Sequence, residues 1–165
     1  GHITLVVLQK HYENTTKRFD TVRSQILNYM RERMSTYLFE QNRFHVIEPE
    51  FVVLAVSATV EVTEYHRIFD IRNAVKTRLQ EFLNPMTGNY HRNGWNIGVL
   101  PNVTQIKNAL KDIKEIYYIE NIRLTGYKQR VQGLVEVDLE KATKRAYVLP
   151  LSGPHEIIMK VKNPD

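Results

Sequence analysis

The amino-acid sequence predicts an α+β fold, in which amphipathic helices pack on mixed or antiparallel sheets. Apolar residues recur every three or four positions in two long segments, as on one face of a helix, and alternate with polar residues in a third, as in a half-buried strand. The end of the chain is a β-rich tail of strand-like segments separated by turns. With 165 residues, the chain can bury a substantial core. We expect two small α+β units, residues 1–50 and residues 51–165.

Composition and charge exclude several classes of protein. The chain has no cysteine, which excludes a disulfide scaffold, a zinc-thiolate site, an iron–sulfur cluster and cysteine catalysis. Its 23 Lys and Arg residues against 18 Asp and Glu residues give a net charge of +5, an excess too mild to indicate nucleic-acid binding by itself. No apolar run approaches the roughly 18 residues of a membrane span, so we expect no membrane partner.

The first unit is predicted to contain a strand, a helix and a second strand. Ile3–Leu8 is rich in β-branched residues and predicts a largely buried strand. From Thr15 to about Leu38 the apolar residues have helical spacing, and Phe44–Glu48 predicts the second strand. The candidates for the N-cap of the helix are Asn14, Thr15 and Thr16.

The second unit begins with the clearest strand of the sequence, Phe51–Thr63. A helix is predicted from about Arg67 to Leu83, because Pro85 disfavours helical geometry in the residue before it. The residues Asn102 to Gln105 have the spacing of a capping box, which predicts a short helix through Ile113. One face of the strand should be formed by Val52, Leu54, Val56, Ala58, Val60 and Val62.

The tail is predicted to be all strand and turn, with no helix after residue 113. Its strands are expected at Ile116–Leu124, Val131–Leu139, Ala146–Leu151 and Glu156–Val161, with turns near Gly126 and at Glu140–Lys144. Apolar residues on these strands either pack on the protein's own core or form a surface for weak self-association, which we favour. The residues of this surface are Val135, Val137, Leu139, Ile157, Met159 and Val161.

The sequence contains no constellation of catalytic residues. Of the six histidines, His45 is the one considered as a metal ligand, with the carboxylates of Glu48 and Glu50 nearby. His45 and Glu48 would point to opposite faces of a strand, because their separation is odd. Sequence motifs of zinc proteases, serine hydrolases and phosphate-binding loops are missing. We therefore expect no enzyme activity, no metal and no small-molecule cofactor.

The sixteen residues from Asn84 to Val99 predict a long loop. They include three glycines, four asparagines and the only tryptophan, Trp95, without any periodicity. Loops of this length in a compact domain usually have a function. One hypothesis is a binding loop; the other, which we favour, is that Trp95 packs as an apolar latch and holds the loop on the helices.

Nucleic-acid binding is the main alternative function. Tyr127 and Lys128, close to Arg123 and Arg130, are the best candidates for a base-stacking platform. The alternation of aromatic and glycine residues typical of ribonucleoprotein motifs is missing. Tyrosines that cover sheet edges and helix contacts are the more common arrangement.

Residues 3–124 resemble the central to C-terminal region of the baseplate J-like proteins, the wedge components of contractile phage tails and related injection systems. The resemblance rests on the alternating strand, the helix ending in Leu83-Asn84-Pro85, the capped helix and the segment Tyr118–Ile122. Two departures are Lys114-Glu115-Ile116, where many members have a Gly-Val step, and residues 125–165, which do not align. The most specific element is the loop pattern formed by Pro85, Thr87, Gly88, Gly94, Trp95 and Gly98.

The resemblance implies a non-enzymatic structural protein that assembles by protein–protein contacts. Residues 1–50 would be the β-α-β end of a central domain, and residues 51–165 a C-terminal α+β domain. The implied partners are other baseplate proteins and copies of the chain itself. The implied location is a virion tail baseplate, or the bacterial cytoplasm during assembly of an injection-system particle. No catalytic residues are carried over.

Overall fold

The computed structural model describes residues 1–10 and 16–163. Within these residues the chain forms seven strands, five α-helices and one 3-10 turn, which confirms the α+β fold. The chain divides into two compact units, Gly1–Glu50 and Phe51–Asp165. The division falls at the residue where the sequence indicates a boundary.

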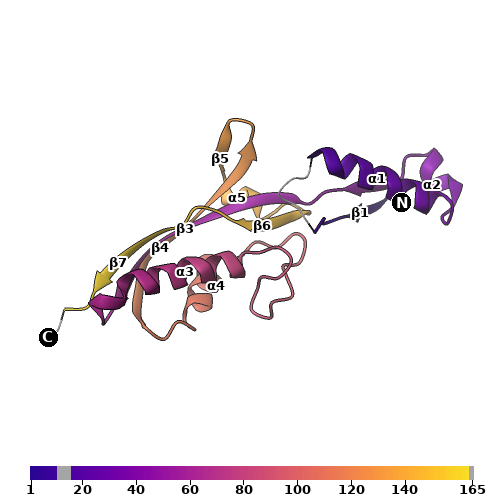
Figure 1. Ribbon diagram of the computed structural model, residues 1–165. Helices are drawn as coiled ribbons and strands as arrows, with labels where there is room; N and C mark the ends of the chain where they lie inside the picture. Colours follow the sequence, from indigo (N-terminus) through magenta and orange to yellow (C-terminus); the bar gives the residue numbers. More distant parts are fainter. Residues whose placement is uncertain (11–15, 164–165) are drawn as a thin grey trace. The chain divides into compact units, whose positions relative to one another are not determined.

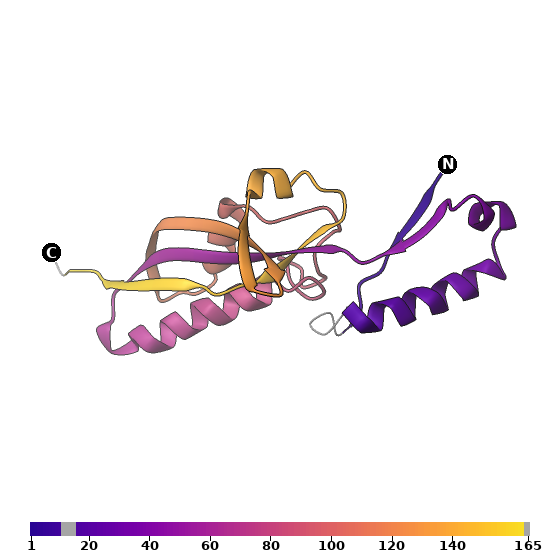
Figure 2. The same cartoon turned by 90° about the horizontal axis from the view of Figure 1, so that it is seen from above.

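The first unit is a parallel strand pair with a helical crossover. Strand β1 (Ile3–Val6) pairs with β2 (Phe44–Ile47), with Ile3 opposite Phe44. Parallel neighbours need a long connection, which α1 (Thr16–Arg31) and α2 (Thr36–Glu40) provide (Figure 2). Helix α1 packs on β2, and the small core of this unit contains Phe19, Phe44 and Val46.

Two predictions for the first unit are wrong. The single helix expected from Thr15 to Leu38 is interrupted, because Ser35 adopts extended dihedral angles (φ −57°, ψ 130°) between α1 and α2. Strand β1 is not buried, since Ile3 and Leu5 are 43% and 39% exposed. The N-cap candidates Asn14 and Thr15 lie outside the described residues, and Thr16 is the first residue of α1.

The second unit is built around β3 (Glu50–Val62), the central strand of a five-stranded sheet. Strand β4 (Ile116–Arg130) runs antiparallel to β3 on one side and pairs with β5 (Gly133–Val137) beyond it. On the other side, β3 pairs with β6 (Val148–Ser152) and, in parallel, with β7 (Glu156–Val161). The predicted apolar face of β3 is confirmed, because none of its six residues is more than 2% exposed.

Two helices cover one face of this sheet (Figure 1). After the 3-10 turn Tyr65–Arg67, helix α3 (Ile68–Phe82) contacts β7 and helix α4 (Val103–Leu110), which contacts β4. Helix α3 buries Ile71, Val75, Leu79 and Phe82, whereas Ile68 at its first position is partly exposed. The predicted capping box of α4 is confirmed: Gln105 N–H donates to Asn102 Oδ1 at 2.9 Å, and Asn102 N–H donates to Gln105 Oε1 at 3.0 Å.

The tail differs from the prediction at two places. Gly126 does not form a turn but lies inside β4, opposite Leu54. A glycine fits this position because Leu139 packs closely against it, and a Cβ atom at Gly126 would lie 2.9 Å from the Cγ atom of Leu139. A short helix, α5 (Leu139–Ala142), replaces the turn expected near Glu140 and lies beyond residue 113, where no helix was predicted. Asp138 begins it by accepting a hydrogen bond from Lys141 N–H at 3.2 Å.

Candidate functional site

The loop at residues 84–99 begins with a turn organised by Asn84. Its Oδ1 accepts hydrogen bonds from the N–H groups of Met86 (2.9 Å) and Thr87 (3.0 Å), and its carbonyl accepts from Gly88 N–H at 2.8 Å. An asparagine side chain that bonds to the backbone two and three residues later replaces helical hydrogen bonds. Helix α3 therefore ends as Pro85 requires, and the chain turns back toward the helix.

Trp95 anchors the far side of the loop to the end of α3. It is 7% exposed, its Nε1–H donates to the Phe82 carbonyl at 2.8 Å, and its N–H donates to the Pro85 carbonyl at 3.1 Å. The Trp95 and Phe82 rings meet edge to face, with centroids 5.2 Å apart. Trp95 was expected to be buried against the second or the third predicted helix; it is buried against the second, α3, and the geometry is that of a latch.

The glycines of the loop allow backbone contacts that a side chain would block. A Cβ atom at Gly88 would lie 2.3 Å from the carbonyl oxygens of both Asn84 and Phe82. Gly94 has φ +83° and lies against the carbonyls of Pro85 and Met86; Gly98 has φ +89°, and its N–H donates to the Val148 carbonyl at 2.8 Å. The loop pattern thus consists of residues with structural roles.

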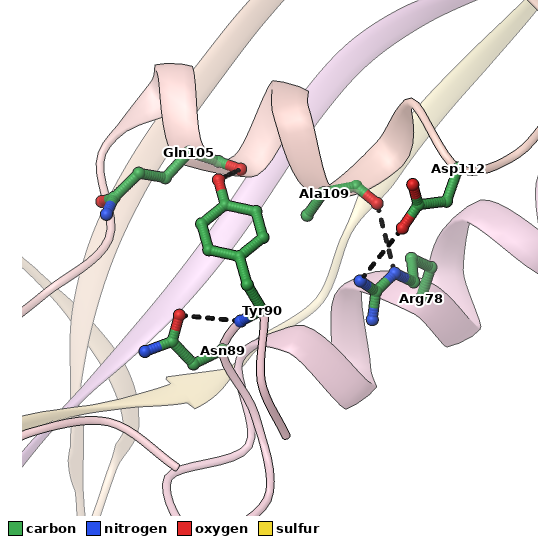
Figure 3. A network of polar contacts seen from close by, with 6 residues as sticks. All are labelled: Arg78, Asn89, Tyr90, Gln105, Ala109 and Asp112. Atoms are coloured by element: carbon green, nitrogen blue, oxygen red, sulfur yellow. Dashed lines mark hydrogen bonds and ion pairs between the residues drawn. The ribbon is translucent and has the colours of Figure 1, made fainter. Parts of the chain in front are cut away.

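A concave surface of about 620 Å³ lies between α3, α4 and the loop. Tyr90 Oη–H donates to the Gln105 carbonyl at 2.7 Å, which ties the loop to α4 (Figure 3). Arg78 Nε–H donates to the Ala109 carbonyl at 3.2 Å, and its Nη2 lies 3.6 Å from Asp112 Oδ2. The charged residues that line the surface are two cations and two carboxylates: Arg78, Arg92, Glu81 and Asp112.

This concave surface has no net charge to attract a charged ligand, since its two cations balance its two carboxylates. Arg78 and Tyr90 instead connect α3, α4 and the loop. Neither residue belongs to a sequence motif. Arg78 lies on α3 between the buried residues Val75 and Leu79. This position in the sequence indicates that its charged side chain has a partner.

Ser152 and His155 form a hydrogen-bonded pair, with 2.7 Å between Ser152 Oγ and His155 Nε2. Val56 N–H donates to His155 Nδ1 at 3.0 Å, so Nδ1 carries no proton and Nε2–H is the donor to Ser152. A base that donates to the hydroxyl cannot remove its proton, so this pair is structural rather than catalytic. Burial, and then the positive charge of Lys76, lower the pKa of His155 to about 4.

The histidine considered for metal binding, His45, lies beside a second histidine. His45 Nε2 lies 3.2 Å from His2 Nδ1, and the two rings stack with centroids 5.5 Å apart. Within residues 1–10 and 16–163, no group of three or more His, Asp or Glu side chains has the geometry to hold a metal ion. His11 lies outside the described residues.

The predicted self-association surface is divided by the fold. Ile157 is 5% exposed, in register with Ala58 on β3, and α3 contacts β7; Met159 and Val161 are partly buried. Leu139 packs over Gly126 and Val52, and Val137 is also partly buried. Of the six residues, only Val135 is largely exposed, at 47%. Val135 is therefore the residue of this set most accessible to a second copy of the chain, and self-association through these residues stays a prediction.

Comparison with known proteins adds no assignment. No family model matches the chain. No curated protein matches it either. None of the helices described here is both long and apolar enough to cross a membrane.

The unusual surface of the first unit is the free edge of β1. Ile3 and Leu5 are in register with the buried Phe44 and Val46, so their side chains continue the core face of β2. Helix α1 packs on β2 and leaves Ile3 and Leu5 exposed. In the part of the chain that the structure describes, no strand pairs with the outer edge of β1.

Proposed function

We propose that this protein is a structural building block of a contractile phage-tail or injection-system baseplate, and that it acts through protein–protein contacts. The observation that carries the protein-contact part of the proposal is the free apolar edge of β1. The resemblance of residues 3–124 to baseplate J-like proteins supplies the identity of the assembly. The latched loop supports the resemblance, because its most specific pattern corresponds to residues with defined structural roles.

The edge of β1 has both the hydrogen-bonding groups and the apolar side chains that a partner strand needs. Ile3 N–H donates to the Arg43 carbonyl at 2.7 Å, and Val7 N–H donates to the Ile47 carbonyl at 2.9 Å. Because backbone groups alternate in direction along a parallel strand, the N–H groups of Thr4 and Val6 point to the outer edge.

A strand added at this edge would extend the sheet and cover the side chains of Ile3 and Leu5. Parallel sheets normally have both faces covered and more than two strands. An exposed edge strand is a template for pairing with another chain. The first unit therefore has the character of a module completed by a neighbour.

Substitution at Thr4 tests this function. Thr4→Pro removes the outward N–H group without removing a hydrogen bond to β2, whereas the control Thr4→Ala retains it. Two epitope-tagged proteins, the wild-type chain and Thr4→Ala, are expressed in cells that produce sheath-bearing particles. We expect both proteins to cosediment with the purified particles. Thr4→Pro should fold, as judged by circular dichroism, and remain in the soluble fraction.

The two parts of the proposal fail differently. If the wild-type chain does not cosediment with sheath-bearing particles, the baseplate function is wrong. If Thr4→Pro is incorporated as well as Thr4→Ala, the chain is a baseplate component but the edge of β1 is not its contact surface.

A further inference from the structure

The sheet of the second unit has one face that α3 and α4 leave exposed. Both helices lie on the face that carries the buried residues of β3 (Figure 1). Because side chains alternate along a strand, the residues between these point to the other face. On β7, Ile157 is 5% exposed whereas the next residue, Ile158, is 54% exposed. A large apolar side chain therefore lies in solvent on this side of the sheet.

The exposed side of the sheet is a regular grid of side chains from β4, β3 and β7. Each of Ser57, Thr59 and Glu61 on the central strand has one register partner on either side. Lys160 Nζ lies 3.6 Å from Glu120 Oε1, so the two outer strands direct these side chains to the same face. We call this surface the open face, and its three rows are Arg123, Ser57 and Glu156; Glu120, Thr59 and Ile158; and Tyr118, Glu61 and Lys160.

The charges of the open face alternate in sign instead of accumulating. Arg123 and Glu156 lie at opposite ends of one row, and Glu120 and Lys160 lie on opposite sides of β3. The face contains two cations and three carboxylates, which does not favour a polyanion such as a nucleic acid. A pattern of alternating charges around an exposed apolar residue is instead suited to a copy of itself.

We propose that the open face binds the open face of a second copy of this chain, about a two-fold axis that runs across the strands through the row of Thr59. In this arrangement Ile158 lies against the partner's Ile158, which covers both apolar side chains. Glu156 lies opposite the partner's Lys160, and the symmetry produces this ion pair twice. Twisted sheets that pack face to face keep their strands within about 30° of one another, so the rows can meet in this order.

A two-fold axis parallel to β3 fits the same side chains less well. It would place Ile158 over the partner's Glu120 and bring the Glu61 carboxylates of the two copies together. The axis across the strands brings the two Glu120 side chains together, but each has the ammonium group of Lys160 within 3.6 Å in its own chain. The axis across the strands is therefore the better match of charge and of apolar contact.

The size of the open face indicates a weak dimer. Nine side chains on three strands cover roughly 300 Å² per copy at the residue and strand spacings of a sheet. A stable complex buries about 800 Å² per partner, so we expect reversible association with a dissociation constant of about 0.1 mM. The proposal does not rest on the baseplate function, because it uses the sheet of the second unit and not the edge of β1.

Sedimentation equilibrium of the full chain, at concentrations up to about 1 mM, measures the association. Ile158→Glu places two carboxylates on the two-fold axis and should weaken the dimer by at least about tenfold. The matched control is Val135→Glu, at a residue of β5 that is 47% exposed, and it should change the dissociation constant by less than about twofold. Circular dichroism should show that both variants fold, since both side chains are exposed.

A pair of charge substitutions tests the orientation of the two copies. Glu156→Lys alone faces the partner's Lys160, and Lys160→Glu alone faces the partner's Glu156, so each variant should associate at least about fivefold more weakly than the wild type. In an equimolar mixture of the two variants, opposite charges face each other at both positions of the mixed dimer. The mixture should therefore associate more tightly than either variant alone.

Three results would overturn the proposal. One is a strict monomer at about 1 mM. Another is a loss of association in Val135→Glu that equals or exceeds the loss in Ile158→Glu, which would place the contact on β5 or show a general effect of charge. The third is a mixture of Glu156→Lys and Lys160→Glu that associates no better than the separate variants, because the proposed axis requires these two positions to face each other.

Discussion

The indole Nε1–H of Trp95 donates a hydrogen bond of 2.8 Å to the carbonyl of Phe82, the last residue of α3. The same carbonyl also accepts a hydrogen bond from Asn89 N–H at 2.9 Å, so two residues of the long loop are fixed to the end of the helix. We expect Trp95→Ala to lower the free energy of unfolding by about 3–5 kcal/mol, because it removes a buried aromatic side chain and its hydrogen bond. Urea unfolding measures the change. The control Ile97→Ala, at a residue 43% exposed, should cost less than about 1 kcal/mol; a similar small cost for Trp95→Ala would contradict the latch.

Gly88→Ala should be the most damaging glycine substitution in the loop. The added Cβ atom would lie 2.3 Å from two backbone carbonyl oxygens, which cannot rotate away as a side chain could. We expect a loss of about 3 kcal/mol in thermal or urea unfolding. Gly133→Ala is the comparison, since a Cβ atom there meets nothing within 4 Å although φ is +116°, and it should cost about 1 kcal/mol. Equal costs would show that the loop backbone moves to accept a side chain.

Stability should fall as the pH decreases from about 6.5 to about 4. The pKa of His155 is lowered to about 4 in the folded protein, whereas an unfolded histidine titrates near 6.5. In this range the unfolded chain binds a proton that the folded chain does not. The full contribution of His155 to the free energy of unfolding is therefore present above about pH 6.5, and it is lost progressively below that pH. Because the ring is only partly buried, we expect a loss of about 1–2 kcal/mol. His155→Asn should flatten this part of the pH profile of unfolding, and the exposed His66→Asn should not; identical profiles for the wild type and His155→Asn would refute the assignment.

The two contacts of Arg78 should contribute unequally to the free energy of unfolding. Its bond to the Ala109 carbonyl is made by a side chain only 16% exposed, while its ionic partner Asp112 is 79% exposed. Arg78→Lys removes the Nε donor and should cost about 1–2 kcal/mol. Asp112→Asn should cost less than about 0.5 kcal/mol, because exposed ion pairs contribute little. Chemical denaturation of both variants checks the order, and a larger effect of Asp112→Asn would reverse this interpretation.

The features that could be predicted from the sequence are those determined by nearby residues. The alternation in β3 identifies its buried face, the spacing of Asn102 and Gln105 identifies a helix start, and the glycines around Trp95 identify a closed loop. Each depends on residues within about one loop length of one another.

The features that could not be predicted depend on distant contacts. Glycine is a residue typical of turns, but Gly126 lies inside a strand, where the close packing of Leu139 leaves no room for a side chain. β-branched residues in β1 indicate a strand but not whether anything covers it. Lys128 and Arg130 on β4 and Lys141 on α5 line one concave surface although they are separated in the sequence. For the same reason, the sequence does not indicate that His155 accepts a hydrogen bond from the N–H group of Val56, which lies 99 residues away.

The parallel pairing of β7 with β3 has a consequence for how the protein is made. Ser57 to Val62 pair with Glu156 to Val161, so this side of the central strand stays open until about 99 further residues have been synthesised. At about 5–20 residues per second, this interval is roughly 5–20 seconds on the ribosome. Closing so long a loop is also slow after release, because its entropy must be lost before the contacts form. During this time the most apolar strand of the chain lacks one neighbour, so its exposure to chaperones and to other nascent chains is greatest before folding is complete.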